Sequence, residues 1–548
     1  MYQPPCRNTV KAKIKENVKI MQEKITSRLK ECDSVNVTVD IWSDRVMRSF
    51  MGITAHVMEE TPLHLSTYTL ACSRFVGSHT GERISQQFNK VIEDYKIQQK
   101  LDFVITDNAA NMKKAFTVSF PSSATDNSDL TNDHDSNDET ETQLETESSL
   151  DTSIDLDDDT VWFSLDDLEQ EEVDSNLSNS AKRGRLSCFA HTLQLCIGDG
   201  LNETKGIRKA MSKASKLTSM VHTSCVFKEA FSATFGDEKG IPKANSTRWN
   251  SILKQLQGVV MLDHQKLSDM CKQTGHGELI LSVREWAQLK ELVDILLPFY
   301  EATQLTQGEC KPTISLVVPT VLALARHLTN FAKKARYLKP LATALNHSIR
   351  KRYKGIFANV GMEGELQDLG NAHNFGETVY LTAVLLDPTF ALHWLVDVSI
   401  STEEKEVLRN KKKELVVNEA EELMGDNETQ NTTSEEEDEP PAKHTKLFSS
   451  YKRRRTSSSG KPPAAQYMKY LETTEEEVES CIEFWVVHKV KFPALALLVK
   501  KVLAIPASSA PVERVFSRGG IIMRPHRSRL GDEILSNLVF LKCNKDCQ

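Results

Sequence analysis

Two hydrophobic periods follow one another near the N-terminus, and their order constrains the fold more than any other feature. Residues 8 to 31 carry apolar side chains at helical spacing. From Val35 to Ile41 apolar and polar residues alternate instead, which predicts a strand with one buried face. The pattern continues with strands predicted over 50–58 and 63–73, a helix over 81–95, a strand over 101–106 and a helix over 108–116. This order predicts an α/β layered fold.

A strongly acidic segment interrupts this module. Residues 122 to 180 contain 20 Asp and Glu residues and no Lys or Arg. The segment has too few large apolar residues to offset its ordering entropy, so we predict a disordered acidic insertion over 122–184. Within it, Val161 to Leu168 mixes aromatic and acidic residues, which fits either a short partner-binding motif or plain disordered sequence. Because the whole chain has a net charge of −8, the remainder is positive by 12, as in proteins that bind phosphates.

The middle of the chain is predicted to be helical. From 204 to 422 the apolar residues recur at helical spacing, and Ser282 with Glu285 forms the sequence pattern of a capping box. Pro298 is expected to break or kink the helix that begins there. We therefore predict an all-helical domain inserted into the α/β module.

A second linker is predicted over 425–466. It contains an acidic run, four prolines and the basic cluster Lys452, Arg453, Arg454 and Arg455. The cluster fits a nuclear import signal, and a solvated charge run is the alternative. With 548 residues, the chain is long enough for roughly three or four domains.

Cysteine spacing and hydropathy exclude two classes of protein. None of the eleven cysteines forms a Cys-x-x-Cys pair, which argues against a zinc ribbon or a disulfide framework. No apolar run approaches the roughly 20 residues of a membrane span, so no membrane partner is expected.

Three carboxylates are candidates for metal-dependent phosphodiester chemistry. Asp40 ends one predicted strand, Asp107 follows another, and Glu513 comes from a helix or turn far along the chain. Two-metal cleavage needs carboxylates that converge from separate elements, but the spacing of these three acids does not by itself join them. Taken singly, a strand-end aspartate is more often a turn or helix cap.

The segments around these acids resemble, in the same order, those of the hAT transposase superfamily. The matching segments are Val37 to Ser43, Val104 to Met112 and Ser508 to Ser517. The resemblance implies an RNase H-like core in which Asp40, Asp107 and Glu513 bind Mg²⁺ or Mn²⁺, if the enzyme is active. All three acids are intact.

Further segments extend the resemblance. Cys188 to Leu193 is similar to the family's Cys-x-x-His element, and a structural or DNA-contacting role is expected for Cys188 and His191, since no second ligand pair for zinc follows. In Ser246 to Ser251 the resemblance implies that Arg248 and Trp249 hold DNA at the cleavage site. A buried tryptophan beside a surface arginine is the alternative.

The C-terminal part is similar to the family's dimerisation region. Its apolar residues at helical spacing are Leu495, Leu498, Val502, Phe516, Leu538 and Leu541. Such faces pack either on their own domain or on a second chain, and periodicity does not distinguish the two. The resemblance implies self-association and a C-terminal segment that completes the RNase H-like core.

The resemblance is strongest to vertebrate BED-finger proteins derived from hAT transposases, although no Cys and His spacing of a BED zinc finger occurs in this sequence. The expected organisation is a helical segment over 1–34, the first part of the core over 35–121, the acidic insertion over 122–184, the core continuation with the helical domain over 185–424, the linker over 425–466 and the dimerisation region over 467–548.

Three functions fit these features. We favour a domesticated nuclear protein that self-associates, binds DNA or chromatin and regulates transcription. The alternatives are an active DDE-type transposase and a fingerless partner that dimerises with BED-finger relatives.

Overall fold

The computed structural model describes residues 5–43, 48–117, 184–244, 249–362, 374–430, 462–474, 478–523 and 530–545. Most of the predicted acidic insertion, the basic cluster Lys452–Arg455 and Arg248 lie outside these ranges.

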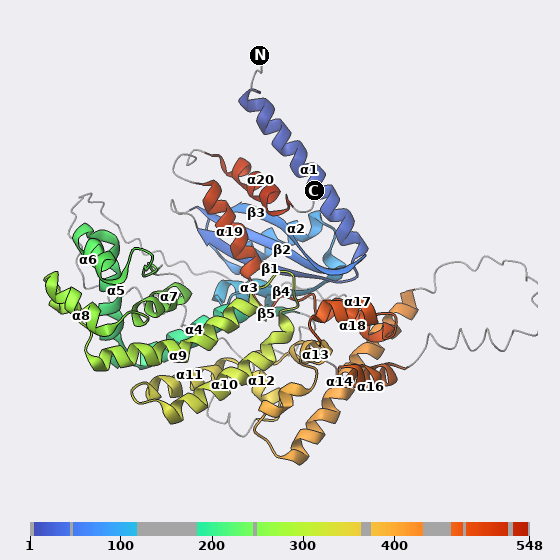
Figure 1. The fold of residues 1–548 in the computed structure, drawn as a ribbon. Coiled ribbons are helices and arrows are strands. Elements are labelled where there is room, and N and C mark those ends of the chain that lie inside the picture. The colour runs from blue at the N-terminus through green and yellow to red at the C-terminus, as the bar shows by residue number, and fades with distance from the viewer. Residues whose placement is uncertain are drawn as a thin grey trace, which may run out of the picture.

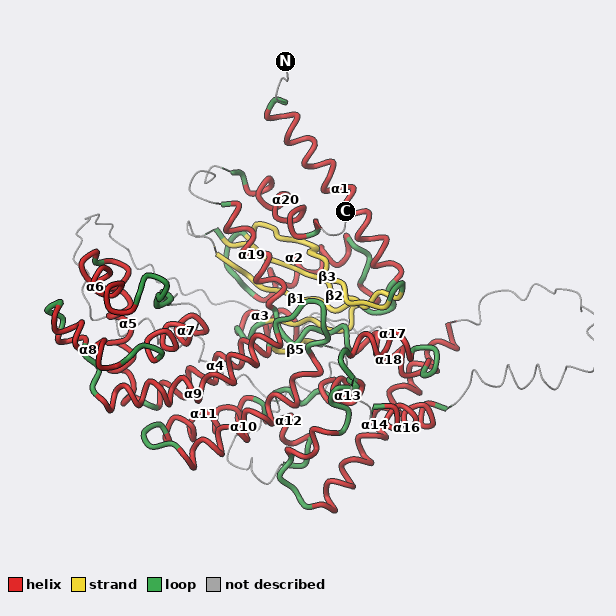
Figure 2. Tube along the Cα trace, in the orientation of Figure 1, coloured by secondary structure: helices red, strands yellow, loops and turns green. Residues whose placement is uncertain are grey.

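A five-stranded sheet forms the centre of the molecule, with the order β3-β2-β1-β4-β5. The strands are β1 (Val35–Ser43), β2 (Ser49–Glu60), β3 (Leu63–Phe75), β4 (Leu101–Thr106) and β5 (Arg185–Ser187). The first three form the antiparallel meander that the sequence predicts, while β4 and β5 run parallel to β1. Only β5 was not predicted. Figure 2 shows the strands gathered between helices.

Helices from the N-terminal part build one core on this sheet. They are α1 (Arg7–Glu31), α2 (Gly81–Asp94) and α3 (Ala110–Thr117). Fully or almost fully buried side chains from α1, β1 and α2 meet there, among them Ile25, Val37 and Phe88. Phe88 packs edge-to-face on Phe116 of α3, with ring centroids 4.9 Å apart. The outer part of α1 extends away from the sheet (Figure 1).

The mostly helical remainder confirms the prediction for the middle of the chain. Its helices are α4 (Phe189–Glu203), α5 (Arg208–Thr223), α6 (Cys225–Phe235), α7 (Trp249–Val260), α8 (His264–Gln273), α9 (Val283–Thr306), α10 (Val317–Lys334), α11 (Lys339–Arg352), α12 (Lys354–Asn359), α13 (Val379–Leu386) and α14 (Thr402–Gln430). One described stretch, Ile314–Lys334, would pass for a membrane span by length and composition, but its Val317, Val321 and Leu328 are fully buried, as in a core helix.

Helix α9 tests two predictions made from local sequence. The capping box is confirmed, because Ser282 Oγ accepts from Glu285 N at 3.1 Å and Glu285 Oε2 accepts from Ser282 N at 2.8 Å. Of the two outcomes predicted at Pro298, the break does not occur, since α9 continues through the proline to Thr306, and the kink stays a prediction. Phe299 and Ala302 are buried immediately after the proline, and their packing holds the helical path.

The C-terminal helices divide between the two parts of the molecule (Figure 1). Helices α16 (Pro463–Thr473), α17 (Cys481–His488) and α18 (Pro493–Val502) join the helical part, where α18 packs against α13 and α14. Helices α19 (Ala510–Ile522) and α20 (Asp532–Cys543) return to the sheet, where α20 packs on β3. Helix α14 runs to Gln430, so the linker begins later than the predicted residue 425.

Asn544 fixes the end of the chain to the edge strand of the sheet. Its Oδ1 accepts from Thr69 N at 3.0 Å and its Nδ2 donates to Thr69 O at 2.9 Å. One side chain thus occupies both backbone groups of Thr69 on β3, a position where an edge strand would otherwise be open to pairing.

Candidate functional site

Asp40 and Asp107 come to the same level of the sheet through its register. In the parallel pairing of β1 with β4, Thr38 lies opposite Ile105. Asp40 follows Thr38 by two residues, and Asp107 follows Ile105 by two residues. Because β1 and β4 are neighbours, both carboxylates lie at the same end of adjacent strands. Glu513 joins them from the first turn of α19.

Tight packing places α19 against the sheet. A Cβ at Gly52 of β2 would lie 2.5 Å from Val512 Cγ2 and 2.7 Å from the Phe516 ring, so only glycine admits this approach. Since Val512 directly precedes Glu513 in α19, the contact with Gly52 also positions the third carboxylate.

The segment before α19 is tied to the helical part by buried hydrogen bonds. Ser508 Oγ donates to the Thr306 carbonyl at 3.1 Å, and Ala507 N donates to Thr313 Oγ1 at 2.9 Å. Ser509 N and Ser509 Oγ both lie 3.3 Å from the Cys188 thiol. The small residues of this C-terminal segment therefore fit between α4 and α9.

The three carboxylates share one electrostatic neighbourhood. Burial raises the pKa of Asp40 well above its ordinary value, and the negative charges of Asp107 and Glu513 raise it further. A hydrogen bond from Ile41 N to Asp40 Oδ1, 2.8 Å long, opposes the shift. The sequence predicts this grouping of Asp40, Asp107 and Glu513, and the structure brings the three residues together at electrostatic range.

The donor chemistry at this site suits a hard divalent cation, but the spacing does not. Carboxylate oxygens are the donors that Mg²⁺ and Mn²⁺ prefer. Within the described residues, however, no group of three His, Cys, Asp or Glu side chains lies close enough to hold one ion. In this conformation the acids do not form a closed ligand set.

Arg185 of β5 organises the loop that carries Asp107. Its Nε donates to Thr106 Oγ1 at 2.7 Å and its Nη2 to Asn108 Oδ1 at 3.1 Å, and Nη2 also donates to the Asp107 carbonyl. Sequence reasoning missed this residue, because a three-residue strand gives no periodic signal. Its position directly before the Cys188 segment was the only sign.

Cys188 and His191 lie beside the carboxylates. Cys188 caps α4 with no exposed surface, and burial raises its pKa to about 11. This position fits the structural role rather than direct contact with DNA. For His191, burial lowers the pKa, while the negative charge of Asp107 opposes the change.

The other predicted site residues are mostly in the core. Trp249 begins α7 and is 8% exposed, which fits the alternative of a buried tryptophan. The residues predicted for dimerisation pack within the chain: Leu495, Leu498, Val502 and Phe516 are buried, and Leu538 and Leu541 are partly buried. They therefore offer little surface to a second copy.

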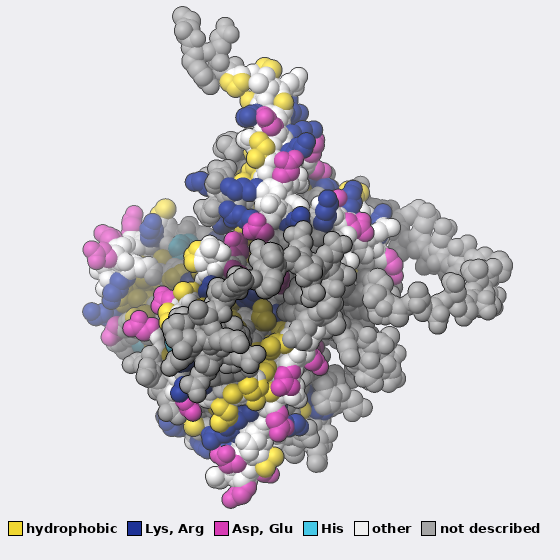
Figure 3. All heavy atoms as spheres, turned by 90° about the vertical axis from the view of Figure 1, so that its right-hand side faces the viewer, with side chains coloured by type: hydrophobic (Ala, Val, Ile, Leu, Met, Phe, Trp, Pro, Cys, Tyr) yellow, Lys and Arg dark blue, Asp and Glu magenta, His cyan; other side chains and the backbone are white. Residues whose placement is uncertain are grey.

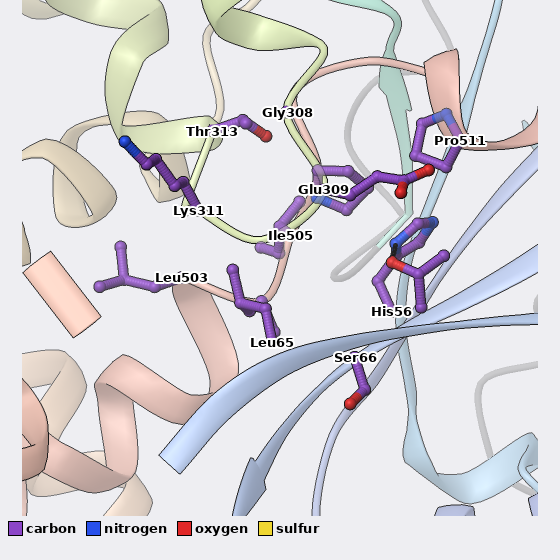
Figure 4. Close-up of a pocket in the computed structure, with 13 residues that line it drawn as sticks. His56, Leu65, Ser66, Gly308, Glu309, Lys311, Thr313, Leu503, Ile505 and Pro511 are labelled. Carbon is purple, nitrogen blue, oxygen red and sulfur yellow. Dashed lines mark hydrogen bonds between the residues drawn. The ribbon is translucent and has the colours of Figure 1, made fainter. Parts of the chain in front are cut away.

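A small cavity lies beside α19, on the side of β2 and β3. Figure 4 shows His56 and the Glu309 side chain next to Pro511. The cavity measures about 20 Å³, which is room for a single water molecule. A nucleotide does not fit there, so any substrate would have to approach the carboxylates from another side.

Two family models match the segments that carry the three acids. The ZBED1 RNase-like domain matches residues 38–133, which include Asp40 and Asp107. The hAT family C-terminal dimerisation region matches residues 465–544, which include Glu513.

Curated relatives are similar to the chain at low identity. "Putative transcriptional regulator tpeD" of Talaromyces stipitatus is 22% identical over 98% of this chain and 57% of its own length. "Putative AC transposase" of Zea mays is 22% identical over 96% of this chain and 58% of its own length. Human "Zinc finger BED domain-containing protein 4" is 22% identical over 67% of this chain and 30% of its own length.

The chain thus spans less than two thirds of the length of these relatives. It carries a ZBED1-type RNase-like domain and a hAT dimerisation region, and its relatives are hAT transposases and BED zinc-finger proteins.

Proposed function

We propose that this protein self-associates through its hAT region, associates with DNA or chromatin in the nucleus, and acts there as a transcription regulator. One observation carries the proposal: the matched dimerisation region buries most of its apolar side chains but exposes three valines in and just after α17. Val486, Val487 and Val490 are 40%, 72% and 85% exposed.

A second copy of this chain is the partner that these valines fit. They lie within five consecutive residues at the end of one helix, and contiguous exposed apolar surface marks interaction sites. In a two-fold symmetric dimer the same patch meets itself, so one cluster supplies both sides of the contact. The region that contains them is the one matched as a dimerisation region.

Several observations support the regulatory part of the proposal. Outside the acidic segment 122–180 the chain is net positive, which favours binding to phosphates. The basic cluster Lys452–Arg455 supports nuclear import from the sequence alone. A relative similar over almost the whole chain is named as a transcriptional regulator, and BED-finger relatives are candidate partners.

Sedimentation of the purified chain tests self-association. The natural chain is expected to form a dimer or larger assembly. The double variant Val487→Asp with Val490→Asp should weaken the affinity of self-association at least about tenfold, because each substitution places a charge in an apolar contact. Val226→Asp is the matched control, since Val226 is 71% exposed on α6, outside the dimerisation region. A natural chain that stays monomeric at all concentrations would contradict the proposal.

Titration with a short duplex at several salt concentrations tests DNA association. Binding that weakens steeply with salt is expected from phosphate contacts. No binding at low salt would contradict this part of the proposal while leaving self-association intact. A reporter fused to residues 440–462 tests nuclear import separately.

Metal-dependent DNA cleavage is the second candidate function. The observation that favours it is the strand register, which places Asp40 and Asp107 at the same end of the neighbouring strands β1 and β4, with Glu513 in the first turn of α19. The negative charges of Asp107 and Glu513 accordingly raise the pKa of the buried Asp40. These three residues would hold a divalent cation only if their carboxylates came closer together than in this conformation, and the ion would then supply charge stabilisation at the phosphate.

Plasmid nicking in Mn²⁺ tests this candidate with the natural chain and Glu513→Gln. Glu472→Gln on α16 is the control, since Glu472 is exposed and pairs only with Lys469 among the contacts described. Nicking that disappears in Glu513→Gln alone supports cleavage by this site. The cleavage proposal is contradicted if neither the natural chain nor Glu513→Gln nicks the plasmid, or if these two proteins and Glu472→Gln nick it equally.

A further inference from the structure

A groove with one apolar and one basic side has lining residues that are distant in sequence from Asp40, Asp107 and Glu513. It has a volume of about 350 Å³ and runs between the 3₁₀ helix His393–Asp397, the first turns of α14 and the end of α16. Leu392, Val396 and Leu471 contribute apolar surface, and Lys405, Arg409 and Lys413 contribute positive charge. This side of the molecule faces the viewer in Figure 3, where hydrophobic side chains gather on the lower half beside Lys and Arg.

The three cations form one row on α14. Their spacing of four residues places them on the same helix face, one turn apart. A row at this spacing presents charges at regular steps along the groove.

The charges in the row are only partly neutralised. Arg409 Nη1 donates to Glu406 at 2.9 Å, but among the described residues its buried Nε has no hydrogen-bond partner. Lys405 reaches the Val396 carbonyl only at 3.5 Å. The nearby acid Asp397 pairs with Arg326 instead.

The groove therefore fits an occupant that carries apolar and acidic groups together. Val396 is 79% exposed at its rim, so apolar surface is available to a ligand. A nucleic acid backbone would use the cations but leave this apolar side uncovered. An acidic peptide with aromatic or aliphatic residues would use both sides.

We propose that this groove binds the acidic-aromatic segment Val161 to Leu168 of the same chain. The segment contains Trp162, Phe163, Leu165 and two aspartates, and Glu169, Glu171 and Glu172 follow it closely. No Lys or Arg lies between 122 and 180 to compete for these acids. The other acidic run, Glu435 to Glu439, contains no apolar residue and so matches only the basic side.

The length of chain beyond the segment permits this contact. Fifteen residues, or sixteen residue steps, separate Leu168 from Gly184, where the described structure resumes. That length spans at most about 55 Å when extended. A folded body of this size has a radius of gyration on the order of 22 Å, so the segment can reach much of its surface.

Photo-crosslinking in the full chain tests the proposal. Benzoylphenylalanine replaces Phe163, and the crosslinked peptides are identified by mass spectrometry in a mixture of isotope-labelled and unlabelled protein. Crosslinks within one chain to residues 391–396 or 405–413 are expected. Replacement of Leu144, in a stretch of the acidic segment without aromatic residues, is the control and should give at least about fivefold fewer of them.

Charge reversal tests the role of the basic row. Arg409→Glu with Lys413→Glu should reduce the crosslinks at least about fivefold, whereas Lys228→Glu with Lys266→Glu on exposed surfaces of α6 and α8 should not. Crosslinks elsewhere, crosslinks only between chains, or none would overturn the proposal. The proposal would also be overturned if the charge reversal weakened DNA binding but left the crosslinks unchanged. That result would identify nucleic acid as the occupant of the groove.

Discussion

Trp42 of β1 stacks on Phe516 of α19, with ring centroids 5.8 Å apart and ring planes 17° apart. Trp42 follows Asp40 by two residues on one strand, and Phe516 follows Glu513 by three residues on one helix. A single aromatic contact therefore couples a residue near the first carboxylate to a residue near the third. It explains why the C-terminal segment belongs to the same folded unit as the N-terminal sheet.

Gly52→Ala should disturb this contact. The added Cβ overlaps Val512 and Phe516, so α19 must move or strain, at a cost of about 1–3 kcal/mol in the free energy of unfolding. Gly520→Ala in the same helix meets no atom of the described residues within 4 Å and should stabilise by up to about 1 kcal/mol. Chemical denaturation compares the two variants. Equal stability in both would contradict the close approach of α19 to β2.

His56 should make the fold sensitive to acid. Burial lowers its pKa to about 3 from an ordinary 6.5, and the charge of Arg514 adds to the shift. The neutral ring is held by hydroxyl groups, with Thr54 Oγ1 at 3.0 Å and Thr67 Oγ1 at 3.1 Å. The folded state disfavours protonation of His56. The contribution of the neutral His56 ring to folding stability is therefore complete above pH 6.5 and falls as the pH drops from 6.5 toward 3.

His56→Gln is expected to lower the free energy of unfolding at pH 7. The natural chain loses free energy of unfolding between pH 7 and pH 5, and the variant should lose about 2 kcal/mol less over the same range. Denaturant midpoints at several pH values measure this difference. His347→Gln, at an exposed position, should keep the pH dependence of the natural chain. A His56→Gln profile parallel to the natural one would show that the imidazole is not buried in its neutral form.

The cysteines should divide into two classes of reactivity. Cys225 and Cys310 are exposed, whereas burial raises the pKa of Cys188 to about 11 and that of Cys196 to about 12. A rise from 9 to 11 alone lowers the thiolate fraction about 100-fold, and lack of access lowers the rate further. Pulse alkylation followed by mass spectrometry should label Cys225 at least about 100-fold faster than Cys188. Comparable rates would show that the contact with Ser509 opens readily.

Glu291 should be important for the helical part. Its carboxylate accepts backbone N–H groups from Arg336, Tyr337 and Leu338 at 2.8 to 3.3 Å, just before α11 begins. Glu291→Ala removes all of these acceptors and should cost about 1.5–3 kcal/mol, as for other hydrogen bonds to a charged group. Thermal unfolding should show a smaller loss for Glu291→Gln, which keeps one acceptor oxygen. Glu301→Ala, at an exposed position of α9, should leave the midpoint unchanged.

The resemblance to hAT transposases grouped the three acids of the candidate site, and periodic elements predicted the strand positions of two of them. The alternation before Asp40 and the apolar run before Asp107 define β1 and β4, and strand ends place side chains predictably. Arg185 was missed because β5 has only three residues. Helix α9 does not break at Pro298 because burial on both sides of the proline outweighs its local preference.

The sequence by itself determined most of the elements and their α/β then helical order, while the identity of the three acids came from the resemblance to hAT transposases. Local periodicity and caps encode the elements, since each depends on residues only a few positions apart. Only the tertiary structure decided that Leu495, Leu498 and Val502 lie inside one chain while Val487 and Val490 remain outside. An apolar helical face has the same period whether it meets its own core or a partner, so burial is set by contacts distant in sequence.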